Sequence, residues 1–227
     1  MAHKPKWVEM MRCCLIAERA QCRGEFEETV TAALDAGVRT IHLREKSATT
    51  LELYDLAQRL RELTRRYDAL LIVNDRADVA LAVGADGVHL GWQSLPVVEV
   101  RGIVGPERII GKSVHNLEEA VRAATDGADF LFAGPVFDTP SKSGLVPTLG
   151  MERLTEICRT VDLPVIGLGG IDALNAAEVI RAGTDGVAVI RAILAADDPG
   201  AAAARLVAAL LHPSHPWPKQ SPNRGNP

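Results

Sequence analysis

The chain has 227 residues, of which 47% are hydrophobic and 24% charged, a composition typical of a folded domain and not of a disordered chain. The formal net charge is −4 and only 4% of the residues are aromatic, which excludes the basic, aromatic-rich surface typical of nucleic-acid-binding proteins. The four cysteines form no Cys-x-x-Cys pair and have no histidine at zinc spacing, so neither a typical redox motif nor a zinc motif is present.

No apolar stretch reaches the roughly 18–20 residues that a membrane span requires. The N-terminal segment lacks the apolar run and cleavage site of a secretory signal. We therefore expect a cytoplasmic protein with neither a membrane nor a nucleic acid as partner.

Short apolar runs alternate with longer segments of helical periodicity along the chain. This pattern predicts strands at 13–17, 39–44, 70–74, 86–90, 108–113, 129–133, 164–168 and 186–190. It predicts helices at 25–36, 50–66, 76–83, 95–103, 116–125, 150–160, 173–182 and 198–211.

Four strings in the sequence share one pattern, in which a helix end and a polar turn with glycine lead into a buried strand. They read AGVRTIHL, VGADGVHL, DGADFLFAG and AGTDGVAVI. Eight strand–helix units without a Gly-x-Gly-x-x-Gly fingerprint predict an α/β fold, a single closed (β/α)₈ barrel or TIM barrel, over residues 1–211. Residues 212–227 contain five of the 13 prolines and no periodicity, which predicts a disordered tail.

Polar residues at the carboxyl ends of the strands are the candidate functional residues, because the active site of such barrels lies there. In the second strand, alternation directs Ile41 and Leu43 towards the helices and His42 and Arg44 towards the barrel axis. Arg44 and Lys46 together could bind a phosphate group. The alternative for Arg44 is a structural ion pair with an inward-pointing carboxylate.

The third strand ends in Asn74 and Asp75. Asp75 could bind Mg²⁺ through its carboxylate oxygens, or it could cap the helix that begins near Ala77. His89 in the fourth strand and Ser113 in the fifth also point inward by alternation. For His89 the alternative is a hydrogen-bonded core residue, and for Ser113 a local turn or cap.

Two loops complete the candidate site. The long connection at 134–144 contains Thr139, Ser141 and Lys142, which could bind a second anion, unless this loop is merely solvent-exposed. After the seventh and eighth strands, glycines and a following helix could bind phosphate through backbone N–H groups, at Gly167, Gly169, Gly170, Val189, Ile190 and Arg191. The residues by themselves thus indicate a barrel enzyme for phosphorylated ligands, either two of them or one with phosphates at both ends.

Over roughly residues 13–195 the sequence resembles the thiamine phosphate synthase / thiazole tautomerase family. The resemblance lies in the order and spacing of HLREKS, NDRADVALAVGADGVHLG, IIGKSVHNLEEA, FAGPVFDTPSKSG and PVIGLGGI with DGVAVI. It implies a synthase that joins hydroxymethylpyrimidine pyrophosphate to hydroxyethylthiazole phosphate and releases pyrophosphate. The implied alternatives are a thiazole tautomerase acting on a thiazole carboxylate phosphate, and a non-catalytic binder of thiamine-pathway phosphates.

The resemblance also implies roles for individual residues. Arg44, Lys46 and Asn74 would contact the pyrophosphate, with further contacts from Ser113 and Lys142, and Asp75 would bind Mg²⁺. Thr139 and Ser141 would bind the thiazole phosphate from one side, and Gly169 and Gly170 from the other. His42 and His89 would contact substrate. The sequence leaves open whether the chain forms a homo-oligomer.

The sequence departs from the family pattern at several of these positions. His42 replaces a glutamine, Arg191 a small hydroxyl residue and Pro135 the acid/base histidine of the tautomerases. Ser94 stands where a synthase has its second Mg²⁺-binding aspartate. Hard cations favour carboxylate oxygens, so we expect weaker Mg²⁺ binding.

Overall fold

In the computed structural model, which describes residues 4–139 and 147–211, eight parallel strands close into a barrel. The strands follow one another around the barrel in chain order, and the last pairs with the first. The predicted TIM barrel is therefore confirmed. The strands are β1 Cys13–Ala17, β2 Thr40–Leu43, β3 Leu70–Asn74, β4 Gly87–Leu90, β5 Ile109–Val114, β6 Phe130–Ala133, β7 Val165–Leu168 and β8 Gly186–Val189.

Helices surround the barrel, and each of the eight predicted ones is present to within about three residues at its ends. They are α2 Phe26–Asp35, α3 Thr50–Arg66, α4 Ala77–Ala82, α5 Val97–Val104, α6 Leu117–Thr125, α7 Gly150–Thr160, α8 Ala176–Arg181 and α10 Pro199–Leu211. Three short elements are additional to the prediction: α1 Lys6–Met10, the 3₁₀ helix η1 Arg19–Gln21, and α9 Arg191–Leu194. No helix in the described ranges is both long and apolar enough to cross a bilayer. The predicted tail at 212–227 lies outside the described residues.

Side-chain caps fix where two of the helices begin. Thr49 accepts a hydrogen bond from the N–H of Glu52, whose carboxylate accepts the N–H of Thr49, so α3 begins with a complete capping box. Asn116 caps α6 by accepting the N–H of Glu119. The Glu119 carboxylate accepts the N–H of His115 in return, one residue before the cap.

Alternation along the strands separates two apolar layers. The outer layer, between sheet and helices, contains Ile41 and Leu43, while the inner layer fills the barrel around Phe130 and Phe132. The adjacent residues Cys13 and Cys14 lie in the outer and inner layers respectively, both as buried free thiols. The inward and outward faces predicted for β2 are therefore confirmed.

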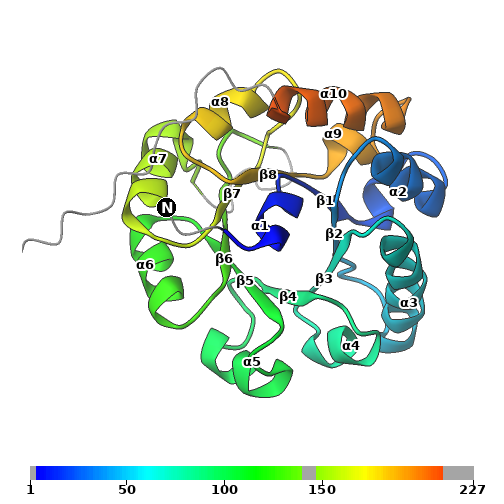
Figure 1. The fold of residues 1–227 in the computed structure, drawn as a ribbon, viewed down its shortest axis with the longest axis horizontal. Helices are drawn as coiled ribbons and strands as arrows, with labels where there is room; N and C mark the ends of the chain where they lie inside the picture. The colour runs from blue at the N-terminus through cyan, green and yellow to red at the C-terminus, as the bar shows by residue number, and fades with distance from the viewer. Residues whose placement is uncertain (1–3, 140–146, 212–227) are drawn as a thin grey trace, which may run out of the picture.

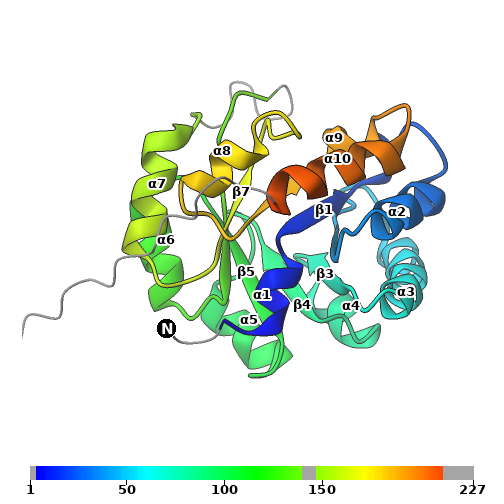
Figure 2. The same ribbon diagram turned by 45° about the horizontal axis from the view of Figure 1, so that its top comes forward.

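The short helix α1 closes the barrel at the end where the strands begin. Viewed along the barrel, α1 lies in front of its centre, and the turned view places it at the lower end (Figures 1 and 2). Met11, directly after this helix, is fully buried in the inner layer, and Trp7 and Met10 pack against that layer. Because α1 packs apolar side chains across this end, the polar end of the barrel interior is the one where the strands finish.

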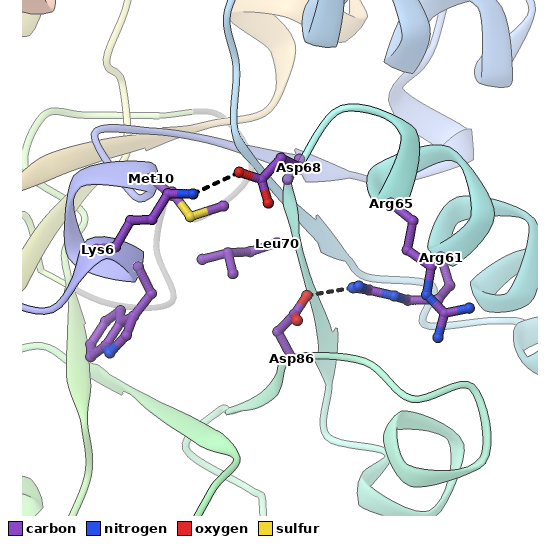
Figure 3. A pocket seen from close by; sticks show the side chains of 9 residues that line it. Lys6, Met10, Arg61, Arg65, Asp68, Leu70 and Asp86 are labelled. Carbon is purple, nitrogen blue, oxygen red and sulfur yellow. Dashed lines mark hydrogen bonds and ion pairs between the residues drawn. The ribbon is translucent and has the colours of Figure 1, made fainter.

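Aspartates that directly precede even-numbered strands fasten the strand starts to one another. Asp86 donates its N–H to the carbonyl of Leu71 (2.9 Å) and accepts the N–H of Leu71 on its carboxylate (2.8 Å). The same carboxylate pairs with Arg61 of α3 at 2.5 Å (Figure 3). One side chain thus satisfies both backbone groups of a residue in the preceding strand and binds a cation.

The same arrangement occurs twice more, before β6 and before β8. Asp129 bonds both backbone groups of Ile110 and pairs with Arg101 at 2.5 Å. Asp185 bonds those of Val165 and pairs with Lys4. We refer to Asp86, Asp129 and Asp185 as the strand-start aspartates. They occupy the Asp position of the repeated strings GADG, GADF and GTDG.

Replacing a strand-start aspartate should destabilise the barrel. Asp129→Ala leaves the N–H of Ile110 without its carboxylate acceptor and Arg101 without its partner, so we expect the free energy of unfolding to fall by about 2 kcal/mol. Urea denaturation measures this loss. Asp162→Ala is the matched control, because Asp162 is exposed and its side chain makes no hydrogen bond within the described residues. Equal midpoints for the two variants would contradict the role of Asp129.

Candidate functional site

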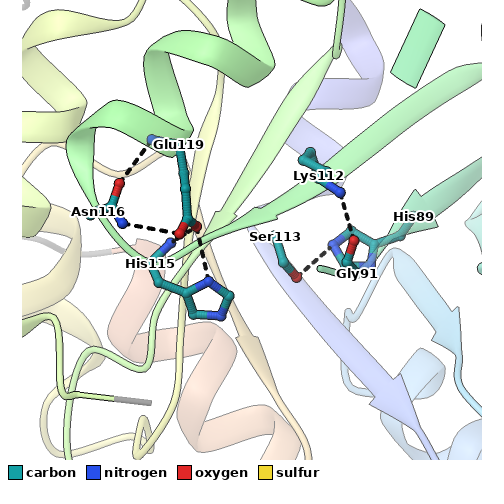
Figure 4. Close-up of polar contacts among 7 residues, drawn as sticks. All are labelled: His89, Gly91, Lys112, Ser113, His115, Asn116 and Glu119. Atoms are coloured by element: carbon teal, nitrogen blue, oxygen red, sulfur yellow. Dashed lines mark hydrogen bonds and ion pairs between the residues drawn. The ribbon is translucent and has the colours of Figure 1, made fainter. Parts of the chain in front are cut away.

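A continuous chain of hydrogen bonds crosses the carboxyl ends of β3, β4 and β5. The hydroxyl of Ser113 lies 3.3 Å from Nε2 of His89 (Figure 4), and Nδ1 of the same ring lies 3.4 Å from Oδ1 of Asn74. The amide of Asn74 donates to Asp75 at 2.6 Å, and the carboxylate of Asp75 also accepts from the hydroxyl of Ser94. The structure therefore brings together four of the predicted site residues, Asn74, Asp75, His89 and Ser113.

The chemistry of these groups fixes the direction of the hydrogen bonds on either side of Asn74. An ionised carboxylate only accepts, so the NH₂ group of Asn74 faces Asp75 and its oxygen faces His89. Nδ1 of His89 must then carry a proton, whereas the hydroxyl of Ser113 can either donate to Nε2 or accept from it. His89 is almost fully buried, so these bonds hold its ring in one orientation at the floor of the site.

Asp75 is held in an unusual backbone conformation. Its φ is 61°, in the left-handed region that non-glycine residues seldom adopt, and its N–H donates to the carbonyl of His89 at 2.9 Å. Its carboxylate accepts the N–H of Gly91 at 3.2 Å besides the hydroxyl of Ser94. The alternative of a helix cap is not observed, since α4 has no side-chain cap. Instead the carboxylate joins the ends of β3 and β4 at the exposed rim.

Lys112 is a cation near this carboxylate that the sequence analysis did not single out. Its alternation in β5 directs it outward, yet its ammonium group bends to the rim and donates to the carbonyl of Gly91 at 2.6 Å (Figure 4). Partial burial lowers the pKa of Lys112, and attraction to Asp75 partly opposes that shift. The sequence analysis considered residues that alternation directs inward, so it did not include Lys112. The long, flexible side chain of this residue nevertheless reaches the carboxyl ends of the strands.

His42 lies beside His89 inside the barrel. The two rings meet edge to face with centroids 4.8 Å apart, and Phe132 lies 5.5 Å from the His42 ring. His42 is 1% exposed, and neither ring nitrogen makes a hydrogen bond within the described structure. Burial, reinforced by repulsion from His89 and Arg44, lowers the pKa of His42 well below its ordinary value. His42 is consequently neutral at physiological pH.

Two cationic residues, Arg44 and Lys46, follow β2 at the same end of the barrel. Arg44 is half-buried and pairs through Nη1 with the carboxylate of Glu18, at 2.9 Å. The ion-pair alternative for Arg44 is thus present in the structure, with a carboxylate that follows β1. Its other guanidinium N–H groups make no hydrogen bond to the described residues and remain available. Lys46 lies two residues further along the loop and is exposed.

The loop after β7 packs directly on the loop after β6. Gly169 and Gly170 both have positive φ, and a Cβ on Gly169 would lie 2.7 Å from Pro135. Hydrogen bonds from Val136 to Leu168 and from Phe137 to Gly169 join the two loops. These glycines are therefore required by the close approach of two loops, whether or not a ligand binds there. In the first of the loops, Thr139 donates its N–H to Asp138.

The remaining predicted residues are distributed less compactly. Gly167 faces α8, where a Cβ would lie 2.6 Å from Val179, and Val189 is buried in the outer layer. Ile190 is half-buried before α9, and Arg191 begins α9 and is exposed. Ser141 and Lys142 lie outside the described residues.

The oxygen atoms at the rim suit a hard cation. No group of three or more His, Cys, Asp or Glu side chains in residues 4–139 and 147–211 is placed to hold a metal ion. Mg²⁺, however, is commonly held by one or two carboxylates together with water and substrate phosphates. Asp75 supplies one carboxylate, and the hydroxyl of Ser94 lies against it. The residues present therefore fit Mg²⁺ bound jointly with a phosphorylated ligand.

Taken together, the fold and the rim define a class of protein. A (β/α)₈ barrel carries an ordered acid–amide–imidazole–hydroxyl chain at the carboxyl ends of its strands, with cations beside it. Such an arrangement is typical of a barrel enzyme for an anionic small molecule. Residues 13–193 match the family model described as thiamine monophosphate synthase. The chain belongs to that family.

Individual relatives agree with the family match. The chain is 48% identical over 183 residues to a thiamine-phosphate synthase of Desulfitobacterium hafniense, an alignment that covers 81% of this chain and 88% of the relative. A thiamine-phosphate synthase of Roseiflexus sp. (strain RS-1) is 50% identical over 192 residues, 85% of this chain and 81% of the relative. The structure of a thiamine phosphate pyrophosphorylase from Pyrococcus furiosus superposes with a TM-score of 0.83 at 42% identity, covering 90% of this chain and 97% of that one. These relatives favour neither the tautomerase nor the non-catalytic alternative.

The buried neutral His42 should make stability depend on pH. Its pKa is depressed in the folded protein, so below pH of about 6.5 the unfolded chain binds a proton that the folded chain does not. The free energy of unfolding should fall there by up to about 1.4 kcal/mol per pH unit from this residue. His42→Gln should remove that part of the slope. Urea denaturation of both proteins at about pH 7.5 and about pH 5.5, on either side of the ordinary histidine pKa, measures the difference, and identical slopes would refute the assignment.

Proposed function

We propose that this chain is a transferase of thiamine biosynthesis that couples hydroxymethylpyrimidine pyrophosphate to hydroxyethylthiazole phosphate. The observation that carries the proposal is the identity of about one half, over more than four fifths of the chain, to thiamine-phosphate synthases. The arrangement at the rim supports it, because Asp75, Asn74 and Ser113 are held together beside Arg44. The products would be thiamine phosphate and pyrophosphate.

The bond that breaks joins the pyrimidine methylene carbon to the pyrophosphate oxygen. Its electron pair leaves with the pyrophosphate, and the nitrogen lone pair of the thiazole forms the new carbon–nitrogen bond. Negative charge grows on the leaving group as the bond breaks, so fixed cations there lower the barrier. Arg44, Lys46 and Lys142 would supply that charge, and Asn74 and Ser113 would hold the pyrophosphate in place through hydrogen bonds.

Positive charge develops on the pyrimidine as the bond breaks, so the side chains beneath it should be uncharged. His42 is neutral because its pKa is depressed. Its ring would then not repel the developing cation. Together with Phe132 and His89 this ring would also keep water from the reactive carbon, since water would compete with the thiazole nitrogen.

The phosphate of the second substrate would lie over the joined loops after β6 and β7. Thr139 and Ser141 would contact it from one loop, and Gly169 and Gly170 through backbone N–H groups from the other. Gly167, Val189, Ile190 and Arg191 would complete the surroundings of this phosphate. Binding there fixes the distance between the thiazole nitrogen and the pyrimidine carbon, so the coupling becomes a reaction between positioned groups.

Asp75 and Ser94 would hold Mg²⁺ together with the pyrophosphate. The bound ion would neutralise charge on the leaving group. With only one carboxylate at the site, the ion would be held largely through substrate oxygens, so metal and pyrophosphate should bind interdependently.

A direct assay tests the proposal. Purified protein is given the pyrimidine pyrophosphate, the thiazole phosphate and Mg²⁺, and thiamine phosphate is followed over time. We expect thiamine phosphate and pyrophosphate in equal amounts. The thiazole carboxylate phosphate is supplied in a parallel reaction. Isomerisation in that reaction without coupling in the first would replace the proposal with the tautomerase, and inactivity in both would favour the binder.

Substitutions at the rim test the role given to Asp75. Asp75→Asn should reduce Mg²⁺-dependent turnover by at least about a hundredfold while the thermal unfolding midpoint stays near that of the parent, because it removes the charge at the proposed metal site but keeps an oxygen acceptor for Gly91 and Ser94 and tolerates the positive φ. Activity within a few-fold of the parent would remove Asp75 from the mechanism.

Ser94→Asp is the complementary change. It places a second carboxylate beside Asp75, so half-maximal turnover should require less Mg²⁺. Ser94→Ala serves as its control, because it removes the hydroxyl without adding charge. An unchanged Mg²⁺ titration in Ser94→Asp would show that this position does not contact the metal.

A further inference from the structure

A cavity lies at the opposite end of the barrel from the candidate functional site. It has a volume of about 360 Å³ and is bounded by α1, the last turns of α3, the start of β3 and Asp86, the residue before β4 (Figure 3). Neither the family match nor the proposed reaction gives this cavity a role. Its volume lies within the range of small-molecule sites, roughly 300–1,000 Å³.

The lining combines an apolar wall with a group of cations. Trp7, Met10 and Leu70 form the apolar part and belong to, or pack on, the inner layer of the barrel. Such a wall, with an indole ring in it, suits a planar hydrocarbon body. The charged lining residues are Lys6, Arg61, Arg65, Asp68 and Asp86.

The charges do not balance. Lys6 pairs with Asp68 at 2.7 Å, and Arg61 pairs with the strand-start aspartate Asp86 at 2.5 Å. Arg65 has neither an ion pair nor a side-chain hydrogen bond among the residues that the structure describes, although it lines the same cavity. The lining therefore carries one positive charge in excess, on the solvent-exposed side chain of Arg65.

Arg61 adds a second, independent observation. Its side chain is 13% exposed, and its Nε–H is buried without a hydrogen-bond partner in residues 4–139 and 147–211. A buried N–H donor without an acceptor destabilises the folded state. Because this N–H is enclosed by protein, an acceptor in the cavity would reach it only after the Arg61 side chain has turned.

We propose that this cavity binds a small organic anion with a planar apolar body and a single negatively charged group. The body would pack on Trp7 and Leu70, and the anionic group would pair with Arg65 and accept from Arg61. A neutral molecule of the same shape would leave the excess charge unpaired, so charge as well as shape defines the ligand class.

Benzoate and its neutral analogue benzamide test both parts of the proposal. The chain contains three tryptophans, at positions 7, 92 and 217, so protein labelled with 5-fluorotryptophan gives three ¹⁹F resonances. Trp7→Phe identifies the resonance of Trp7. We expect benzoate to shift that resonance saturably, and benzamide at the same concentrations to leave it in place. Equal shifts with both compounds, or none with benzoate, would overturn the proposal.

Arg65→Gln locates the binding. It should weaken benzoate binding about tenfold, the effect of losing one charge-assisted contact. Arg66→Gln is the matched control, because it removes the same charge from the adjacent residue of the same helix, outside this cavity. Equal benzoate affinity in Arg65→Gln and the parent would overturn the proposal.

Competition distinguishes this cavity from the phosphate-binding end of the barrel. Pyrophosphate should leave the benzoate-induced shift of Trp7 unchanged. Displacement of benzoate by pyrophosphate would mean that the anion binds at the carboxyl ends of the strands, contrary to the proposal.

Discussion

The bonds of the strand-start aspartates are the constraint on which the rest of the barrel depends. Each of these side chains satisfies both backbone groups of a residue in the preceding strand and binds a cation, so β3 is fastened to β4, β5 to β6 and β7 to β8. A parallel barrel has no hairpin turns to fix the offset between neighbours, and these contacts supply that offset. The first pair of strands is different. There Arg39 and Thr40 occupy the corresponding positions, and Thr40 donates its hydroxyl to the carbonyl of Met10.

The register between neighbouring strands is fixed where the strands begin, and it determines which side chains lie together where the strands end. Asn74 pairs with His89 in the register of β3 and β4. On β5 the partner of His89 is Gly111, and Ser113 lies two residues further along that strand. A shift of one residue in either pair would exchange inward and outward faces and separate this hydrogen-bonded chain. The strand-start aspartates therefore contribute to the site although they lie at the far end of the same strands.

The fold was largely predictable from sequence, because buried strands and amphipathic helices alternate with glycines at the helix ends. The five-residue α1 escaped prediction since it is too short to display a period, and α9 because it continues an apolar strand without a break. At the site, the alternation of side chains along the strands correctly placed His42 inside the barrel. The same alternation left out Lys112, although its ammonium group reaches the carboxyl ends of the strands. The pairing of Arg44 with Glu18, and of Ser94 with Asp75, involves residues far apart in the chain whose contact depends on loop conformation. No local pattern encodes such contacts.

The ion pair between Glu18 and Arg44 has a consequence for the release of products. An anion that arrives at Arg44 must share the guanidinium with a carboxylate already seated 2.9 Å from Nη1, or displace it. The protein thus keeps its own competitor at the position, tethered at a high effective concentration. In the proposed reaction, Glu18 would therefore weaken the binding of pyrophosphate to Arg44 and would pair with the arginine again as pyrophosphate leaves. Weaker binding of this product would favour its release.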